Sequence, residues 1–115
     1  MSKQPDAIFR AIDTHRRAEA ALEEILLQQC DWQEAHRDRD GGLRDNPELE
    51  GAEDCASDAE QAAWRALLAT VPTTAHGLRA LLSYLLDSSV LEAGFTAEET
   101  ATLIHTIRQS PALAA

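Results

Sequence analysis

The strongest constraint on the fold is a long run of helically spaced apolar residues at the start of the chain. Steps of three and four residues separate its members, which is the spacing of one buried stripe along an α-helix. They are Ile8, Ala11, Ile12, His15, Ala18, Leu22, Ile25, Leu26, Gln29 and Trp32. Pro5 and Asp6 suit the first turn of such a helix, and no further proline or glycine occurs before Gly41. The pattern predicts one helix over about residues 5–36, which needs other helices or a second copy to cover its stripe.

Three shorter helices are predicted in the rest of the chain. A serine or threonine three residues before a glutamate has capping-box spacing, and it occurs at Ser57–Glu60 and at Thr96–Glu99. Pro72 ends one helix, because the residue before a proline is driven out of helical geometry, and Thr73 or Thr74 can cap the next. The predicted helices span about residues 57–70, 74–91 and 97–109.

The apolar spacing also predicts how the helices pack. The third helix has leucines in steps of three and four, with Tyr84 at one edge of that face. Its expected core residues are Leu78, Leu81, Leu82, Leu85 and Leu86. No segment alternates as a half-buried strand would. We therefore expect an all-α fold, a single helical domain over residues 1–115, with the long first helix packed against a three-helix return.

The acidity of the chain is concentrated between the first two predicted helices. The net charge of the 115 residues is −10, from 20 acidic and 10 basic side chains, and residues 31–60 hold eleven of the acids and three of the bases. Residues 38–56 also contain three of the five glycines and a proline, so we expect an acidic loop there.

This local acidity bears on the choice of partner. It disfavours nucleic acid, because phosphates attract clustered lysine and arginine. It favours a basic protein partner, although an acidic run can also be a solvated loop that keeps a protein soluble. The candidate binding residues are Asp45, Glu48, Glu50, Glu53 and Asp54.

Several other classes of site are not indicated. The four histidines and two cysteines lack the short paired spacings of a zinc site, so no metal and no cofactor is expected. The sequence shows no glycine-rich phosphate loop and no nucleophile elbow, so we do not expect an enzyme. The first residues are polar, and no apolar run reaches the ~18 residues of a membrane span. We expect a cytoplasmic protein that binds no membrane, with Cys30 and Cys55 as free thiols.

The string A-H-G-L-R-A, from Ala75 to Ala80, contains a histidine with a basic residue three positions later. It resembles the A-H-x-L-[KR]-G motif of histidine phosphotransfer domains, which are acidic four-helix bundles. The resemblance implies that His76 accepts a phosphoryl group and that Arg79 helps to neutralise it. Ala80 replaces the usual glycine, and the family's histidine lies in mid-helix, whereas His76 lies four residues after Pro72. The alternative is a surface histidine in the first turn of the third helix.

Two longer patterns cover more of the chain. The first, D-x-[IV]-[FY]-x-A-I-x-x-H-R-x-A, runs here from Asp6 to Ala18. The second, W-x-x-L-L-x-T-x-P-T-T-x-x-G-[LV]-x-A-L-L-x-Y, runs from Trp64 to Tyr84. Together they resemble short uncharacterised helical proteins of alphaproteobacteria and their prophages. The resemblance supports the segmentation and implies a bacterial source, but it implies no activity.

The second pattern also makes physical sense as a tight corner between two helices. A proline ends one helix, a threonine caps the next, and a glycine lets a neighbouring backbone approach. The residues of this predicted corner are Trp64, Pro72, Thr73, Thr74, Gly77 and Tyr84. We further expect His15 and Arg16 of the first helix to hydrogen-bond the carbonyl groups freed near Leu68–Val71.

These observations favour a function without catalysis. We expect a small regulatory or adaptor protein that acts through protein–protein contact, with homodimerisation through the first helix as one mode of association. Two alternatives stay open. One is phosphotransfer through His76. The other is an acidic inhibitor of phage or immunity type, whose acidic segment mimics nucleic acid or meets a basic enzyme.

Overall fold

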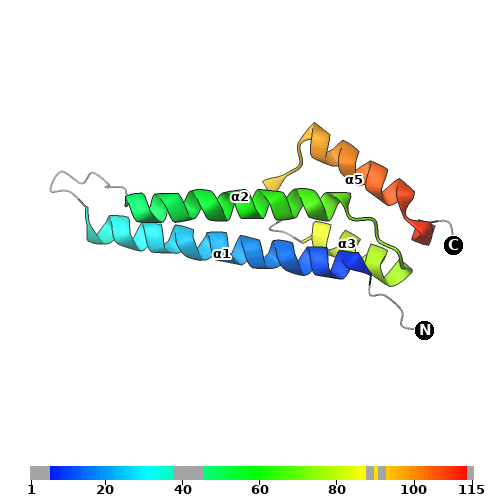
Figure 1. Cartoon of the computed structure of the whole chain (residues 1–115), viewed down its shortest axis with the longest axis horizontal. Helices are drawn as coiled ribbons and strands as arrows, with labels where there is room; N and C mark the ends of the chain where they lie inside the picture. The colour runs from blue at the N-terminus through cyan, green and yellow to red at the C-terminus, as the bar shows by residue number, and fades with distance from the viewer. Residues whose placement is uncertain (1–5, 38–45, 88–89, 91–92, 114–115) are drawn as a thin grey trace. The chain divides into compact units, whose positions relative to one another are not determined.

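The computed structural model of the chain describes residues 6–37, 46–87, 90 and 93–113. Within these ranges the regular secondary structure is helical and contains no strand, which confirms the expected all-α fold with a long first helix (Figure 1). The elements are α1 (Ala7–Ala35), α2 (Pro47–Ala69), α3 (Ala75–Leu85), α5 (Ala97–Gln109) and the short 3₁₀ helix η1 (Pro111–Leu113).

The residues of the chain group into two compact units. Unit 1 consists of Met1–His15 and Ala63–Ala115, and unit 2 consists of Arg16–Ala62. The helices α1 and α2 each contribute residues to both units. The two units are described separately below, because they differ in core and in charge.

The prediction of an acidic loop over residues 38–56 is wrong from residue 47 onward. The second helix begins at Pro47 and continues to Ala69, so Ser57, the expected cap, lies inside it. Residues 38–45 lie outside the described residues.

Local chemistry explains why α2 starts so early. The side chain of Asn46 accepts hydrogen bonds from the backbone N–H groups of Glu48, at 3.0 Å, and of Leu49, at 3.5 Å. Pro47 takes the first helical position, where its missing N–H costs nothing. Glu48 and Glu50 place negative charge near the positive end of the helix dipole. The acids that suggested a loop therefore stabilise a helix start.

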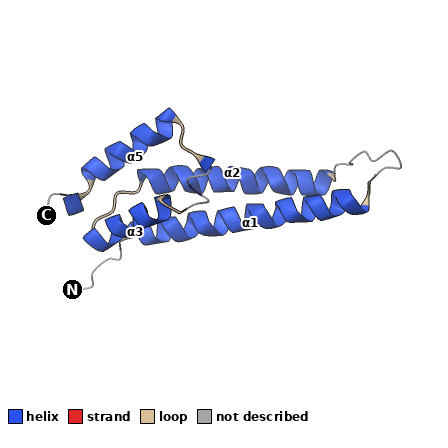
Figure 2. Cartoon of the chain, turned by 180° about the vertical axis from the view of Figure 1, so that it is seen from behind, coloured by secondary structure: helices blue, strands red, loops and turns tan. Residues whose placement is uncertain are grey.

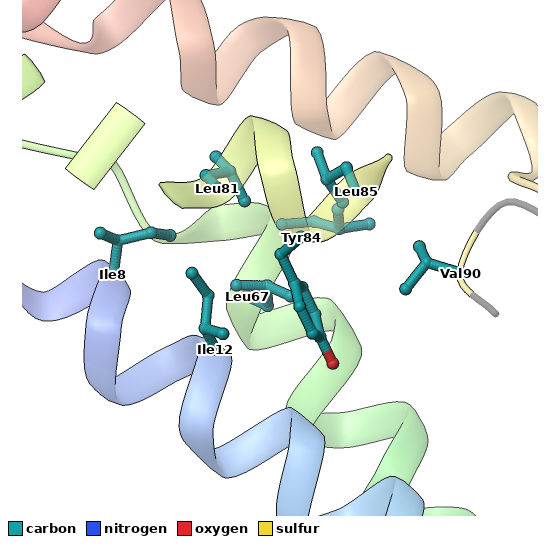
Figure 3. Close-up of a cluster of buried hydrophobic side chains, with 8 residues drawn as sticks. Ile8, Ile12, Leu67, Leu81, Tyr84, Leu85 and Val90 are labelled. Atoms are coloured by element: carbon teal, nitrogen blue, oxygen red, sulfur yellow. The ribbon is translucent and has the colours of Figure 1, made fainter. Parts of the chain in front are cut away.

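Unit 1 contains the apolar core. Figure 3 shows side chains of α1, α2 and α3 converging on one another. The cluster consists of Ile8, Ile12, Leu67, Leu68, Leu81, Tyr84, Leu85 and Val90. Two partly buried side chains pack against this cluster: Phe95, which precedes α5, and Leu103, which lies in α5. Burial of this apolar surface is the main stabilising contribution to unit 1.

The buried face of α3 is turned from the expected one. Leu81 and Leu85 are buried as predicted, and Tyr84, expected at the edge, is buried too. Leu82 and Leu86, expected in the core, are 43% and 70% exposed. Tyr84 lies between Leu82 and Leu86 in the sequence, so the helix face that buries its ring leaves these two leucines, four residues apart, on a different side of α3.

Unit 2 is a helical hairpin with little apolar burial. Residues 16–35 of α1 and residues 47–62 of α2 run side by side in opposite directions (Figures 1 and 2). Among the described residues of this unit, no apolar side chain is fully buried, and the buried residue is Gln29. Cys30 and Cys55 are exposed free thiols, one on each helix.

Charge follows the same division. Unit 2 holds 14 acidic and 5 basic residues, a net charge of −9 out of −10 for the whole chain. In the part of the chain that the structure describes, no helix combines the length and the apolar character needed to cross a lipid bilayer.

Candidate functional site

The corner between α2 and α3 receives the side chain of Asp6. The Oδ2 atom of Asp6 accepts hydrogen bonds from the backbone N–H groups of Thr73 and Thr74, both at 3.1 Å, and from Oγ1 of Thr74 at 2.8 Å. Its Oδ1 atom accepts from the N–H of Ile8 at 3.3 Å and so caps α1. One carboxylate therefore joins the starts of two helices that are far apart in sequence.

The hydrogen bonds hold Asp6 in its charged form. Desolvation by burial acts to raise the pKa of the Asp6 carboxyl, whereas the hydrogen bonds from Thr74, Ile8 and Thr73 lower it. The net result is a pKa below the ordinary value for aspartate, because four donors are satisfied only by the carboxylate. Asp6 is thus a structural anion at neutral pH and not a proton donor.

Gly77 leaves the space that Asp6 occupies. A Cβ atom at this position would lie 1.9 Å from Oδ2 and 2.8 Å from Cγ of Asp6, and 2.9 Å from Cγ2 of Ile8. The N–H of Gly77 donates to Oγ1 of Thr74 at 2.9 Å, the bond by which Thr74 caps α3. We expected Gly77 to admit a neighbouring backbone, and the group that approaches it is the Asp6 side chain.

The carbonyl groups freed at the corner are bonded from the C-terminal part of the chain. Oγ1 of Thr106 donates to the Leu68 carbonyl, and Oγ of Ser110 donates to the Pro72 carbonyl, each at 2.5 Å. Both hydroxyl-bearing residues are buried. Of the carbonyl groups near Leu68–Val71 that we expected His15 and Arg16 to bond, that of Leu68 accepts from Thr106. The expected bonds from His15 and Arg16 stay a prediction.

His15 lies in a buried cluster of rings in unit 1. Its Nδ1 atom is 2.6 Å from the hydroxyl oxygen of Tyr84, and its ring centroid is 5.0 Å from that of Trp64. The Trp64 ring in turn lies 5.5 Å from that of Phe95. The contact between His15 and Tyr84 gives a partner to one polar atom of each of these buried side chains.

Trp64 also ties α2 to the start of α5. Its indole N–H donates to Oε2 of Glu99 at 2.5 Å, while Oε1 of Glu99 accepts from the backbone N–H of Thr96 at 2.9 Å. Thr96 accepts from the N–H of Glu99 at 3.1 Å, which completes the predicted capping box. The backbone bond from Thr96, then the Trp64 side chain and the nearby charge of Arg65, lower the pKa of Glu99 against the effect of desolvation.

The string A-H-G-L-R-A lies at the start of α3. His76 is the second residue of that helix and is exposed, with its ring centroid 5.3 Å from that of Phe9. Arg79 is exposed one turn later. This first-turn position agrees with the interpretation of His76 as a surface histidine, and it differs from the mid-helix position that the phosphotransfer resemblance implies.

The acidic candidates that the structure describes lie on a helix and not in a loop. Asp45 lies outside the described residues, and the other four are on α2: Glu48, Glu50, Glu53 and Asp54. A row of exposed acids at four-residue spacing runs along α2 and consists of Glu50, Asp54 and Asp58. Like charges at this spacing repel one another by about 0.2–0.5 kcal/mol per pair, so a cation beside the row would stabilise the helix.

Hydrogen bonds thus hold the corner residues in place, and the acidic row of Glu50, Asp54 and Asp58 on α2 is exposed. Within residues 6–37, 46–87, 90 and 93–113, no group of three or more histidine, cysteine, aspartate or glutamate side chains is arranged to hold a metal ion. Comparison of the chain with protein-family models, with curated proteins and with solved structures gave no match.

Proposed function

We propose that this chain is a small regulatory or adaptor protein that binds a basic protein partner through unit 2. The proposal rests on one observation: the acidic charge is concentrated in unit 2, whereas the described buried apolar side chains lie in unit 1. Unit 2 has a net charge of −9, and none of its described apolar side chains is fully buried. Every described buried apolar side chain belongs to unit 1.

The hairpin of unit 2 gains little from its own packing. Over residues 47–62 of α2, Leu49 is the only large aliphatic side chain, and it is half-buried. A helix of this length is marginal in water unless an apolar face is covered. A partner that covers the hairpin would supply the missing burial, so binding and ordering of unit 2 would reinforce each other.

The charge of unit 2 selects among partners. A surface with many carboxylates attracts a basic protein, accelerates the encounter and disfavours acidic competitors. The same charge opposes self-association of this segment, because residues 16–35 of α1 hold five acids and two bases. Homodimerisation through α1 stays a prediction that light scattering can test, with a monomer at high concentration as the contrary result.

The proposal is tested by neutralising carboxylates of unit 2. We expect the triple variant Glu48→Gln, Asp54→Asn, Asp58→Asn to lose at least tenfold in affinity for the protein that the parent chain captures from source-cell extract, measured with that protein purified. The control is Glu98→Gln, an exposed acid of α5 in unit 1. Undiminished binding by the triple variant would contradict the proposal.

The inhibitor alternative is a special case of this proposal. Its partner would be a nucleic-acid-binding protein, and an oligonucleotide would displace the chain from it by competing for the same basic surface. A partner that binds both simultaneously would reject this alternative and leave the adaptor function standing.

Phosphotransfer through His76 is a separate proposal, motivated by the A-H-G-L-R-A string and by the exposure of the imidazole. Incubation with a phosphorylated response regulator, followed by mass spectrometry of the α3 peptide, tests it. An unlabelled His76 would reject it.

A further inference from the structure

An exposed apolar pair lies on α1 within unit 2. Leu26 is 41% exposed and Leu27 is 61% exposed. On an α-helix the nearest surface neighbours of a side chain are three and four positions away. For Leu27 these neighbours are Glu23, Glu24, Cys30 and Asp31. We call Leu26 and Leu27, together with this rim, the leucine patch.

The rim of the leucine patch is negatively charged and lacks a cation of its own. In the described part of the chain, no hydrogen bond or ion pair engages the carboxylates of Glu23, Glu24 and Asp31. The basic residues of α1 are Arg10, Arg16 and Arg17, and all three precede Leu26 by more than two helical turns. An occupant of the patch must therefore bring its own positive charge.

A second observation comes from the adjacent turn of α1. Gln29, three residues after Leu26, is only 8% exposed, and its Oε1 atom has no hydrogen-bond partner. A buried amide oxygen normally has a donor, so the hairpin beneath the leucine patch is incompletely satisfied in the isolated chain. Next to the leucine patch, unit 2 thus holds a buried acceptor that no described donor reaches.

We propose that the leucine patch is the docking site for a basic amphipathic helix of the partner. The apolar face of that helix would cover Leu26 and Leu27, and its lysine or arginine side chains would pair with Glu23, Glu24 and Asp31. Glu23 and Asp31 are about 12 Å apart along the helix axis, so about three turns of partner helix suffice. A second copy of α1 would bring the same carboxylates to the rim and is disfavoured. This inference rests on the proposed function and names its partner class.

Synthetic peptides provide a direct probe of the patch. The first is an 18-residue basic amphipathic peptide with leucine on one helical face and lysine elsewhere. The second has the same composition in an order that gives no apolar face, and the third replaces each lysine of the first by glutamate. Each is titrated into the full chain by calorimetry in about 150 mM salt.

Two double variants, each replacing a pair of leucines of similar exposure, distinguish binding at the leucine patch from non-specific binding to exposed leucine. The test variant is Leu26→Gln, Leu27→Gln in unit 2. The control is Leu82→Gln, Leu86→Gln in unit 1, whose side chains are 43% and 70% exposed. Glutamine keeps helix propensity close to that of leucine, and far-UV circular dichroism checks that both variants stay helical.

The expected result has two parts. The basic amphipathic peptide binds the parent chain at least tenfold more tightly than the reordered and the acidic peptides do. The test variant binds this peptide at least tenfold more weakly than the parent chain does, while the affinity of the control variant changes less than twofold.

Equal binding of both basic peptides, or equal loss in both variants, would overturn the docking site while leaving a charge-driven function intact. Absence of binding by either basic peptide would count against the proposed function as well. A parent chain that dimerises, with the dimer lost in the test variant, would assign the patch to a second copy and overturn the inference.

Discussion

The carboxylate of Asp6 is the residue on which the corner of unit 1 depends, because it accepts from two backbone N–H groups and a hydroxyl of α3's start. Its pKa is lowered in the folded chain, so its stabilising contribution is complete above the unfolded pKa of about 3.9 and disappears as the pH falls through the folded pKa.

The first prediction follows from that sign. Asp6→Asn should lower the free energy of unfolding by about 1–3 kcal/mol at pH 7, since amide hydrogens would face donors. The difference from the parent chain should shrink as the pH falls below about 4, measured by urea denaturation at several pH values. Glu98→Gln, an exposed acid in the first turn of α5, serves as the control and should lower the free energy of unfolding by no more than about 0.3–1 kcal/mol. A pH-independent deficit of Asp6→Asn would contradict the charged role.

The second prediction concerns two glycines that lie in helices. Gly77→Ala should destabilise the chain by about 1–3 kcal/mol, because the new methyl group would overlap Asp6 and force the corner open. Gly51→Ala, in α2 with no atom within 4 Å of its added Cβ, should raise helix stability by about 0.5–1 kcal/mol. Urea denaturation and circular dichroism measure both, and similar effects of the two substitutions would contradict the described fit of Asp6 against Gly77.

At the scale of elements, local signals were enough for some helix starts and not for others. Thr96 with Glu99, and Thr74, cap their helices as predicted, because a cap depends on residues within one turn. The start of α2 was missed although Asn46 and Pro47 are standard start signals, because the clustered acids and Gly51 suggested a loop. Acids near a helix start are stabilising, so composition was the poorer guide there.

The candidate site shows where sequence reasoning ends. The corner of Pro72, Thr74 and Gly77 could be predicted from the sequence. The Asp6 carboxylate that it binds could not, because Asp6 is 67 residues from Thr73 and 68 residues from Thr74. The donors Thr106 and Ser110 also lie 38 residues from their acceptors, and no periodicity encodes such a pairing. The exposure of Leu82 and Leu86 was not predicted, because leucine spacing alone does not show that the Tyr84 ring takes a place in the core.

The third prediction belongs to the hairpin of unit 2. Gln29→Leu should stabilise the hairpin by about 1 kcal/mol, because it replaces an unpaired buried acceptor by an apolar side chain of similar size. Gln28→Leu, one residue earlier and exposed, should have little effect. Thermal melts followed at 222 nm report the difference between the two variants, and destabilisation by Gln29→Leu would mean that the amide has a partner in solution.

At the scale of the whole molecule, the two units should differ in their resistance to local unfolding. Amides near Leu67, Leu81 and Leu85 in the core of unit 1 should exchange with deuterium at least tenfold more slowly than amides of residues 47–62 in unit 2. Mass spectrometry of peptic fragments measures this prediction. Uniform protection of both units would show that unit 2 has a source of stability besides apolar burial.

Ionic strength should act on the same contrast. Raising the salt concentration from about 10 to 150 mM shortens the range of charge repulsion from about 30 to 8 Å. The fifth prediction is that this change slows exchange in unit 2, which has a net charge of −9, more than in unit 1, whose remaining charge is −1. Equal responses of the two units would contradict an electrostatic weakness of the hairpin.

Both cysteines of the chain lie in unit 2, one on each helix of the hairpin, and both are exposed. The sequence therefore offers two labelling positions without any substitution. Spin labels on Cys30 and Cys55 would report the separation of α1 and α2 before and after a peptide is added.

Cys30 also belongs to the rim of the leucine patch, so its rate of alkylation should fall when the patch is covered. The same exposure makes a reductant necessary in every light-scattering experiment, because oxidation would join two chains covalently and imitate a dimer.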